Sequence, residues 1–283
     1  MATAGAEVRL VDATDAASVA TALQGIQAVV NCVAGDANTI VAAAKGLFGS
    51  AGLAHPRPRI VHLSTMSVYG TAIGVMDEET APLLGDLGPY SAAKIQAEQL
   101  AATYPGVVIL RPGCVFGPDS PQWSTRIARL LQARRLGDLG AAGDGYCNLV
   151  DVQDVVTAVI RALENLTVDG RTYNLSVNTQ PRWNEFLTRY AVALGAVPVQ
   201  RITRRWLRLE GKLIAPPLKV VEIAANRLRL SSPPPIPPSL LRLMAQDIRL
   251  DTRRAQSELN LRCKDLDVMI NETSRWFLQS VGA

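Results

Sequence analysis

The segment Gly88–Lys94 holds a tyrosine and a lysine at the spacing of a proton-transfer pair. If this segment is helical, the side chains of Tyr90 and Lys94 lie on one face of the helix, one turn apart. An ammonium group near a phenol stabilises the phenolate, and so lowers a tyrosine pKa from its ordinary value of about 10. A tyrosine in that setting can exchange a proton with an alcohol or carbonyl oxygen near neutral pH. We therefore predict that Tyr90 is a general acid and base.

Hydroxyl side chains precede this pair, directly after an apolar segment that reads as a strand, Arg59–Ser64. Ligands of parallel α/β sheets bind beyond the carboxyl ends of the strands. We therefore expect Thr65 to hydrogen-bond the substrate oxygen beside Tyr90, with Ser67 as the reserve candidate. The alternative is that both hydroxyls only satisfy backbone groups in a turn.

Strands and helices are expected to alternate along the first two thirds of the chain. The apolar patterns predict strands at 8–11, 28–33, 59–64, 107–111 and 172–177, and helices at 15–23, 38–51, 89–103 and 152–164. This order predicts an α/β fold, with a Rossmann-like parallel sheet and helices on both faces. The later residues are helical stretches interrupted by prolines, which predict a smaller, mostly helical C-terminal domain.

Composition excludes several classes of protein. The 283 residues carry a net charge of only +4 with few aromatic residues, which speaks against a nucleic-acid partner. Four scattered cysteines and two histidines form no metal-ligand pattern, so no metal is expected, and they favour a reducing, cytoplasmic compartment. No segment reaches the roughly 18 apolar residues of a membrane span, and the N-terminus does not resemble a signal peptide.

Several further segments occur in a recognisable order around the tyrosine and lysine. They are Val11–Asp15 (VDATD), Asn31–Gly35 (NCVAG), Leu110–Pro118 (LRPGCVFGP), Asn148–Asp154 (NLVDVQD) and Leu250–Leu259 (LDTRRAQSEL). Together with Ser64–Gly70, this ordered set resembles the extended short-chain dehydrogenase/reductase family, which includes NAD-dependent epimerases, dehydratases and hydroxysteroid-type dehydrogenases. The resemblance implies a dinucleotide-binding domain at 1–118 and 148–178, and a substrate-binding domain at 119–147 and 179–283.

The resemblance also implies an NAD or NADP cofactor, without a preference between the two. Asp12 would contact the adenine amino group, with Ala13 beside it. Ala34 and Gly35 would pass close to the cofactor, where a larger side chain would block it.

At the reacting end of the cofactor, the resemblance implies a second group of contacts. Tyr90 would be the general acid and base, while Lys94 would bind the nicotinamide ribose and lower the pKa of Tyr90. Arg111, Pro112 and Gly113 would flank the nicotinamide.

The glycine-rich strand–turn–helix that holds a dinucleotide pyrophosphate is not found in this sequence. Only seven residues precede the expected strand at 8–11, so we interpret the dinucleotide-binding domain as truncated, without its first two strands. Two glycine patterns, Gly46–Gly52 and Gly137–Gly143, follow a helix and the fourth strand respectively, which is the wrong context for that motif. We expect strand 8–11 to move and pair directly with strand 28–33, and we expect weak NAD(P) binding.

Three functions stay open. The first is an NAD(P)-dependent oxidoreductase that interconverts an alcohol and a carbonyl. Many nucleotide-sugar enzymes of the family carry an asparagine where this chain has Cys114, and an arginine where it has Gly145 or Tyr146. These departures favour a less charged alcohol or ketone as the substrate. The alternative is an NAD-dependent sugar-nucleotide epimerase or dehydratase, and a third reading is a non-catalytic family member. Arginines at 201, 204, 205 and 208 could meet a phosphate, although a solvated helix face explains them as well. A homodimer through helices 38–51 and 89–103 is plausible for this family.

Overall fold

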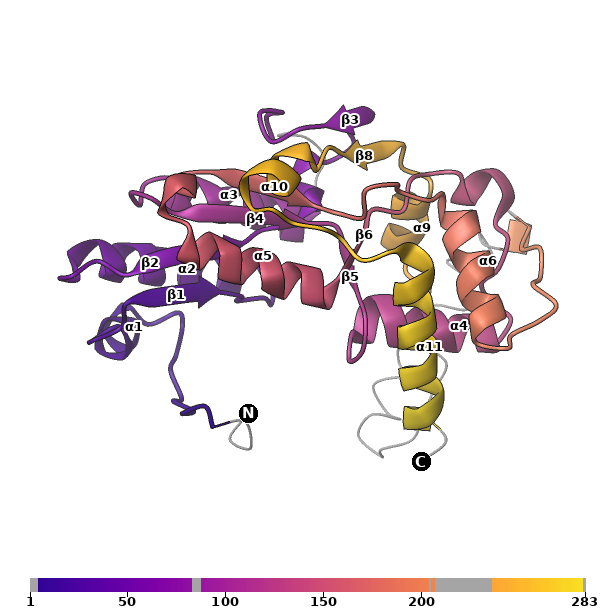
Figure 1. Cartoon of the computed structure of the whole chain (residues 1–283), viewed down its shortest axis with the longest axis horizontal. Coiled ribbons are helices and arrows are strands. Elements are labelled where there is room, and N and C mark those ends of the chain that lie inside the picture. Colours follow the sequence, from indigo (N-terminus) through magenta and orange to yellow (C-terminus); the bar gives the residue numbers. More distant parts are fainter. Residues whose placement is uncertain (1–4, 83–87, 204, 207–235, 282–283) are drawn as a thin grey trace.

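The computed structural model describes residues 5–82, 88–203, 205–206 and 236–281. Its centre is a four-stranded parallel sheet in the order β1 (Ala28–Asn31), β2 (Arg59–Leu63), β4 (Val108–Pro112) and β7 (Thr172–Leu175) (Figure 1). Because all four strands run in one direction, their carboxyl ends meet at a single edge of the sheet.

Helices cover both faces of this sheet, as predicted. On one face, α2 (Ala37–Leu53) and α3 (Pro89–Ala101) pack with Ile60 and Ile109 in one apolar cluster. On the other face, α5 (Val152–Glu164) packs with Val61, which neighbours Ile60 on β2. Successive side chains of a strand point to opposite faces, so strands covered on both sides read as continuous apolar runs.

Carboxylate caps fix where three of the helices begin. Asp15, Asp36 and Asp151 stand at the N-caps of α1 (Ala16–Ala22), α2 and α5, and each accepts hydrogen bonds from backbone N–H groups of the first turn. The helix α3 begins differently, with Pro89 at its first position, where a missing N–H costs nothing.

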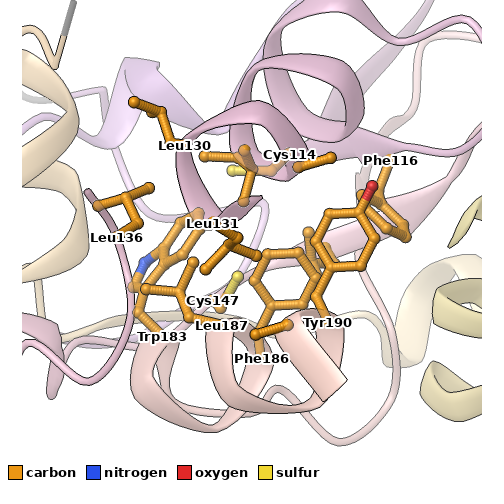
Figure 2. Close-up of a cluster of buried hydrophobic side chains, with 14 of the residues drawn as sticks. Cys114, Phe116, Leu130, Leu131, Leu136, Cys147, Trp183, Phe186, Leu187 and Tyr190 are labelled. Carbon is orange, nitrogen blue, oxygen red and sulfur yellow. The ribbon is translucent and has the colours of Figure 1, made fainter. Parts of the chain in front are cut away.

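The C-terminal third is mostly helical, as expected. Its helices α9 (Pro238–Met244) and α11 (Leu266–Val281) pack with two helices from earlier in the chain, α4 (Arg126–Gln132) and α6 (Trp183–Ala193), and these four form the helical region of the molecule. Phe116, Phe186 and Tyr190 lie at the centre of its core, with ring centroids 5.2 to 5.6 Å apart (Figure 2). Burial of such aromatic rings supplies a large apolar area for a compact second core.

Short strand pairs connect the two parts of the molecule. Strand β3 (Gly74–Met76) pairs with β8 (Ile248–Leu250), and β5 (Cys114–Phe116) pairs with β6 (Leu149–Asp151). After β8 the chain returns to the sheet, where α10 (Arg253–Glu258) packs in the same apolar cluster as β4 and α5. The two-domain division at 118, 148 and 178 stays a prediction, and α10 joins the sheet side.

The predicted pairing of segment 8–11 with β1 is wrong. Residues 8–11 form no strand, Leu10 is 100% exposed, and β1 pairs with β2 alone among the described residues. The turn that follows explains this, because Asp15 N–H donates to Asp12 O and Ala13 lies against Gly46 of α2. These contacts hold residues 12–15 on the helix layer, and the segment before them runs away from the sheet (Figure 1).

Both glycine-rich segments lie where the sequence places them. Gly46–Gly52 is inside α2, and the segment Gly137–Gly143 is a loop that includes a short 3-10 turn, η4 (Gly140–Gly143). Neither lies between a strand and a helix. Over the described ranges, no helix has the length and apolar character needed to cross a membrane.

Candidate active site

A cavity of about 1160 Å³ opens at the carboxyl ends of β1, β2 and β4. The sheet and α3 line one side of it with Cys32, Ala34, Gly35, Ser64, Thr65, Ser67, Tyr90, Lys94, Pro112, Gly113 and Cys114. The helical region lines the other side with residues that include Gln122, Trp123, Arg126, Leu240, Arg242 and Gln246. The cavity therefore lies beyond the carboxyl ends of the strands, where open α/β sheets bind their ligands.

Thr65 and Tyr90 meet in this cavity. Tyr90 stands in the first turn of α3, 43% exposed, and the Thr65 hydroxyl lies near enough to its phenol to lower the pKa of that phenol. Thr65 also caps the short helix η2 (Met66–Tyr69), since its Oγ1 accepts from Ser67 N–H at 3.2 Å. The structure thus shows the backbone cap that the alternative interpretation expects, and the catalytic role of Thr65 stays a prediction, with its hydroxyl fixed beside Tyr90.

Lys94 lies one turn beyond Tyr90 but points to the strand ends. Its ammonium donates to Leu63 O at 3.0 Å and to Val33 O at 3.3 Å, and the residue is only 4% exposed. Burial lowers the pKa of Lys94, while the nearby Cys32 and Glu98 act in the opposite direction. A lysine held by two carbonyls keeps a defined position at the floor of the cavity.

The expected lowering of the Tyr90 pKa by Lys94 is not seen. Burial raises the pKa of Tyr90 above its ordinary value, and only the nearby Thr65 hydroxyl opposes that rise. The reason is geometric, since the Lys94 ammonium is turned toward backbone carbonyls. Tyr90 is therefore a protonated phenol at neutral pH in this structure.

Arg111 does not flank the cavity, which corrects the role that the resemblance implies. Its guanidinium is buried and forms a two-pronged ion pair with Glu98, at 3.0 and 2.7 Å. Its third contact is Tyr69 Oη at 2.9 Å. A charge in the core requires such complete pairing, so Arg111 points inward from β4. Its neighbours Pro112 and Gly113 do line the cavity.

Asp12 and Ala13 lie away from the cavity lining. Asp12 accepts hydrogen bonds from the backbone and hydroxyl of Thr14, at 2.9 and 2.7 Å, and these bonds lower its pKa. Ala13 packs on α2. The structure brings Ala34 and Gly35 to the cavity but not these two residues, because segment 8–11 does not join the sheet.

Close backbone contacts explain two glycines of the motifs. A Cβ at Gly113 would lie 2.0 Å from Asn148 O, and a Cβ at Gly145 would lie 2.4 Å from Gln246 O. Gly145 therefore cannot be an arginine here. Beside it, the Tyr146 ring is stacked by the guanidinium of Arg182, 3.8 Å from its centroid.

Sequence reasoning did not find the cavity wall from the helical region. Trp123 lies on η3 (Pro121–Thr125), a π-helical turn of a kind that often marks functional sites. Arg126 follows on α4, and Arg242 comes from α9, more than a hundred residues later. Their separation along the chain hides the site, and the local signal is Trp123, five residues after the end of the motif 110–118.

Two cavity hydroxyls stand without a partner. The Oγ atoms of Ser64 and Ser67 are buried and have no hydrogen-bond partner. Buried hydroxyls are normally satisfied, so an unpaired pair that lines a cavity is suited to meet a polar ligand. Over the described residues, no three His, Cys, Asp or Glu side chains gather as metal ligands would.

Of the four arginines at 201–208, the structure describes Arg201 and Arg205, and Arg205 is helical and exposed, as the solvated-helix interpretation expects. Arg201 forms an ion pair with Asp138 at 2.9 Å and lies in a bridge, not on a helix. Arg204 and Arg208 lie outside the described residues. The solvated-helix interpretation therefore does not apply to Arg201.

Comparison with known sequences gives a family match and a partial relative. The sequence model of the NAD dependent epimerase/dehydratase family matches residues 2–176. Protein YeeZ of Escherichia coli (strain K12) is 32% identical over 150 residues, which are 52% of this chain and 50% of that protein. The chain thus spans about half the length of this relative.

Solved structures share the fold at low sequence identity. The dTDP-glucose 4,6-dehydratase of Bacillus anthracis str. Ames, in complex with NAD, superposes with a TM-score of 0.70 at 18% identity, over 95% of this chain and 78% of that one. The UDP-glucose 4-epimerase of Thermotoga maritima, with UDP-glucose, gives a TM-score of 0.70 at 16% identity, over 95% and 84%. At such identities the similarity concerns the fold alone.

Proposed function

The chain belongs to the NAD dependent epimerase/dehydratase family, and from that premise we propose that it is an NAD-dependent enzyme acting on a sugar nucleotide. The observation that carries the proposal is that Thr65, Tyr90 and Lys94 line one large cavity at the strand ends, with the Thr65 hydroxyl beside the Tyr90 phenol. The names of its structural neighbours add support, since they are a dehydratase and an epimerase of sugar nucleotides.

The residues on the sheet side of the cavity fit the nicotinamide end of a dinucleotide. Ala34 and Gly35 leave the strand end uncovered, and Pro112 and Gly113 form a second small-residue edge. The unpaired hydroxyl of Ser64 lies between them, ready for a polar group. Bound there, NAD would supply a hydride acceptor for the carbon that bears the substrate hydroxyl.

Tyr90 would move the proton of that hydroxyl. In the carbonyl-to-alcohol direction, the phenol O–H donates to the carbonyl oxygen, and the raised pKa keeps this proton in place at neutral pH. The alcohol-to-carbonyl direction needs the phenolate instead, so this half-reaction should accelerate as pH rises. Thr65, fixed by its cap on η2, would orient the substrate oxygen between the two hydroxyls.

Positive charge in the opposite wall favours a phosphorylated substrate. Arg126 and Arg242 line the helical side of the cavity. Guanidinium groups suit phosphate because their donors match its oxygens in pairs. The flat ring of Trp123 adds an apolar surface beside them. A sugar at Tyr90 with its diphosphate toward these arginines would fill the cavity from the reacting end outward.

A second candidate is a net oxidoreductase for an uncharged ketone. Cys114 favours it, because this buried thiol stands where many nucleotide-sugar enzymes have an asparagine amide. Burial raises the pKa of Cys114, so it presents a neutral, weakly polar surface to the cavity. Such a wall would suit a less polar substrate.

The test is incubation of the purified chain with UDP- and dTDP-hexoses and catalytic NAD, followed by NMR of the sugar products. An epimerase or dehydratase converts sugar without net change in reduced nicotinamide, as measured by absorbance. A net oxidoreductase consumes NAD(P)H in proportion to the product. Absence of both activities over this panel, with Tyr90→Phe behaving as wild type in cells, would favour the non-catalytic reading instead.

A further inference from the structure

A buried polar pair lies directly beneath Lys94, at neighbouring positions on β1 and β2. Asn31 and His62 are register partners on these strands, and they are 6% and 2% exposed. The Asn31 amide Nδ2 and the His62 Nδ1 lie 2.9 Å apart. The ring of Phe48 packs against the imidazole edge-on, at 5.7 Å between centroids. An amide nitrogen can only donate, so the imidazole accepts at Nδ1 and carries its proton on Nε2.

The same asparagine holds the turn that follows β1. Its Oδ1 accepts from Val33 N–H at 3.1 Å. The carbonyl of Val33 is one of the two acceptors of the Lys94 ammonium, and the other is the carbonyl of Leu63, the residue after His62. One amide therefore fixes, through two hydrogen bonds, both strand ends that receive Lys94.

The pair is costly for a purely structural contact. The His62 Nε2 is buried without a partner, which carries a desolvation penalty that an apolar pair of the same shape would avoid. Charge does not explain it either, because burial and the nearby Lys94 lower the pKa of His62 to about 3, so the ring is neutral. What the pair does supply is a defined distance between the two strand ends.

We propose that Asn31 and His62 are positioning residues that hold the two carbonyl acceptors of Lys94 and so set the place of its ammonium in the cavity. The inference rests on the proposed function, since Lys94 has a task only if a cofactor ribose binds beside it. Neither residue touches the cavity, so both act through Val33 and Leu63.

The test reads the pKa of Lys94 by carbon NMR in protein with labelled lysines, without cofactor or substrate. His62→Leu removes the acceptor for the Asn31 amide, whereas His62→Gln, of similar size, offers a side-chain oxygen in its place. The groups that face Lys94 are Cys32, Glu98 and His62, and only the last is changed. The exposed His55, changed to Gln, is the matched control.

In His62→Leu we expect the Lys94 pKa to rise by about one unit, because an ammonium freed from the strand ends turns to solvent in the cavity. His62→Gln and His55→Gln should leave it at the wild-type value. Should His62→Leu not fold, Asn31→Ser breaks the same bond by shortening the side chain and carries the same expectation.

An unchanged Lys94 pKa in a folded His62→Leu or Asn31→Ser variant would overturn the positioning role. An equal rise of the Lys94 pKa in His62→Leu and His62→Gln would also do so, since it would show that ring packing matters and the hydrogen bond does not. Because the readout needs no turnover, a chain inactive on every sugar nucleotide would overturn the proposed function and leave this inference standing or falling on the NMR result alone.

Discussion

The two ends of helix α3 differ in what surrounds them, although one helix face carries both. Tyr90 is 43% exposed at the cavity, while Lys94 and Glu98, one and two turns further on, are 4% and 6% exposed. The exposed end holds a group that can exchange a proton with a ligand. The buried end holds charges that fix neighbouring elements, and of these two charges only that of Lys94 also borders the cavity. Chemistry and positioning are thus separated along a single face of the helix.

The buried end determines the geometry at the exposed end. Glu98 is bound by both prongs of Arg111, and Arg111 also donates to Tyr69 Oη, at 2.9 Å. Tyr69 ends the short helix that Thr65 caps, and its hydroxyl donates to Asn174 at 2.7 Å. The network therefore joins the helix of Tyr90 to the turn of Thr65. This separation predicts that variants at the two ends fail in different ways.

The largest effect should come from the exposed end and appear in rate. Tyr90→Phe removes the proton donor, and we expect turnover to fall about 10²- to 10⁴-fold, as for loss of a general acid. The free energy of unfolding should change by less than about 0.5 kcal/mol, because the ring stays and the site is half-exposed. Steady-state rates and urea denaturation measure the two. A turnover rate of Tyr90→Phe within twofold of wild type would contradict the assignment of the chemistry to the exposed end of α3.

The next effect should come from the buried end and appear in stability. Arg111→Met leaves the Glu98 carboxylate unpaired in the core, which should lower the free energy of unfolding by about 3–5 kcal/mol. Arg9→Met is the control, because Arg9 pairs with Glu7 and both side chains are exposed, so its loss should cost much less than that of the buried arginine. Equal losses of stability in the two variants would contradict a stabilising role for the buried ion pair of Arg111 with Glu98.

Lowering the pH should reduce the free energy of unfolding, because His62 is harder to protonate in the folded chain than in the unfolded chain. Its pKa is lowered to about 3 in the folded chain by burial, against an ordinary value of 6.5, so the unfolded chain binds more protons between these values. Stability should therefore fall as pH drops through 6.5, by about 2 kcal/mol between pH 7.5 and pH 5 from this group. Denaturation at both pH values checks it. His62→Gln should remove that share of the pH dependence, whereas His55→Gln should not.

A smaller effect should appear where the buried network reaches the Thr65 turn. Tyr69→Phe keeps the ring but removes the hydroxyl shared by Arg111 and Asn174, so we expect a loss of about 1–2 kcal/mol in unfolding free energy. Turnover should fall more than in Tyr146→Phe, a hydroxyl deletion outside the cavity lining. If Tyr69→Phe lost stability but turned over as fast as Tyr146→Phe, the network of Glu98, Arg111 and Tyr69 would have no influence on the reaction.

Sequence patterns predicted the sheet, its covering helices and the meeting of Thr65 with Tyr90. They succeeded because these features depend on local periodicity, helix caps and the strand-end rule. Arg111 was misplaced because the motif fixes its position on β4 but not which way its side chain points. The partner that turns it inward, Glu98, lies on another element.

Two other features depend on contacts that no local pattern reports. Residues 8–11 have the composition of a strand, yet a strand forms only beside a neighbour, and the turn at Asp12 carries the segment away from β1. The direction of the Lys94 ammonium likewise depends on the carbonyls of Val33 and Leu63, which the fold places beside it. Spacing alone could not distinguish these carbonyls from the Tyr90 phenol as its neighbour.

The most direct test of the central claim is a single turnover of a sugar nucleotide with stoichiometric NAD, followed by rapid absorbance of the reduced nicotinamide. Wild type and Tyr146→Phe should show a transient rise that returns to the baseline as product forms. Tyr90→Phe should show a rise at least about a hundredfold slower. An equally fast transient in Tyr90→Phe would contradict the assignment of Tyr90 as the acid and base of this site.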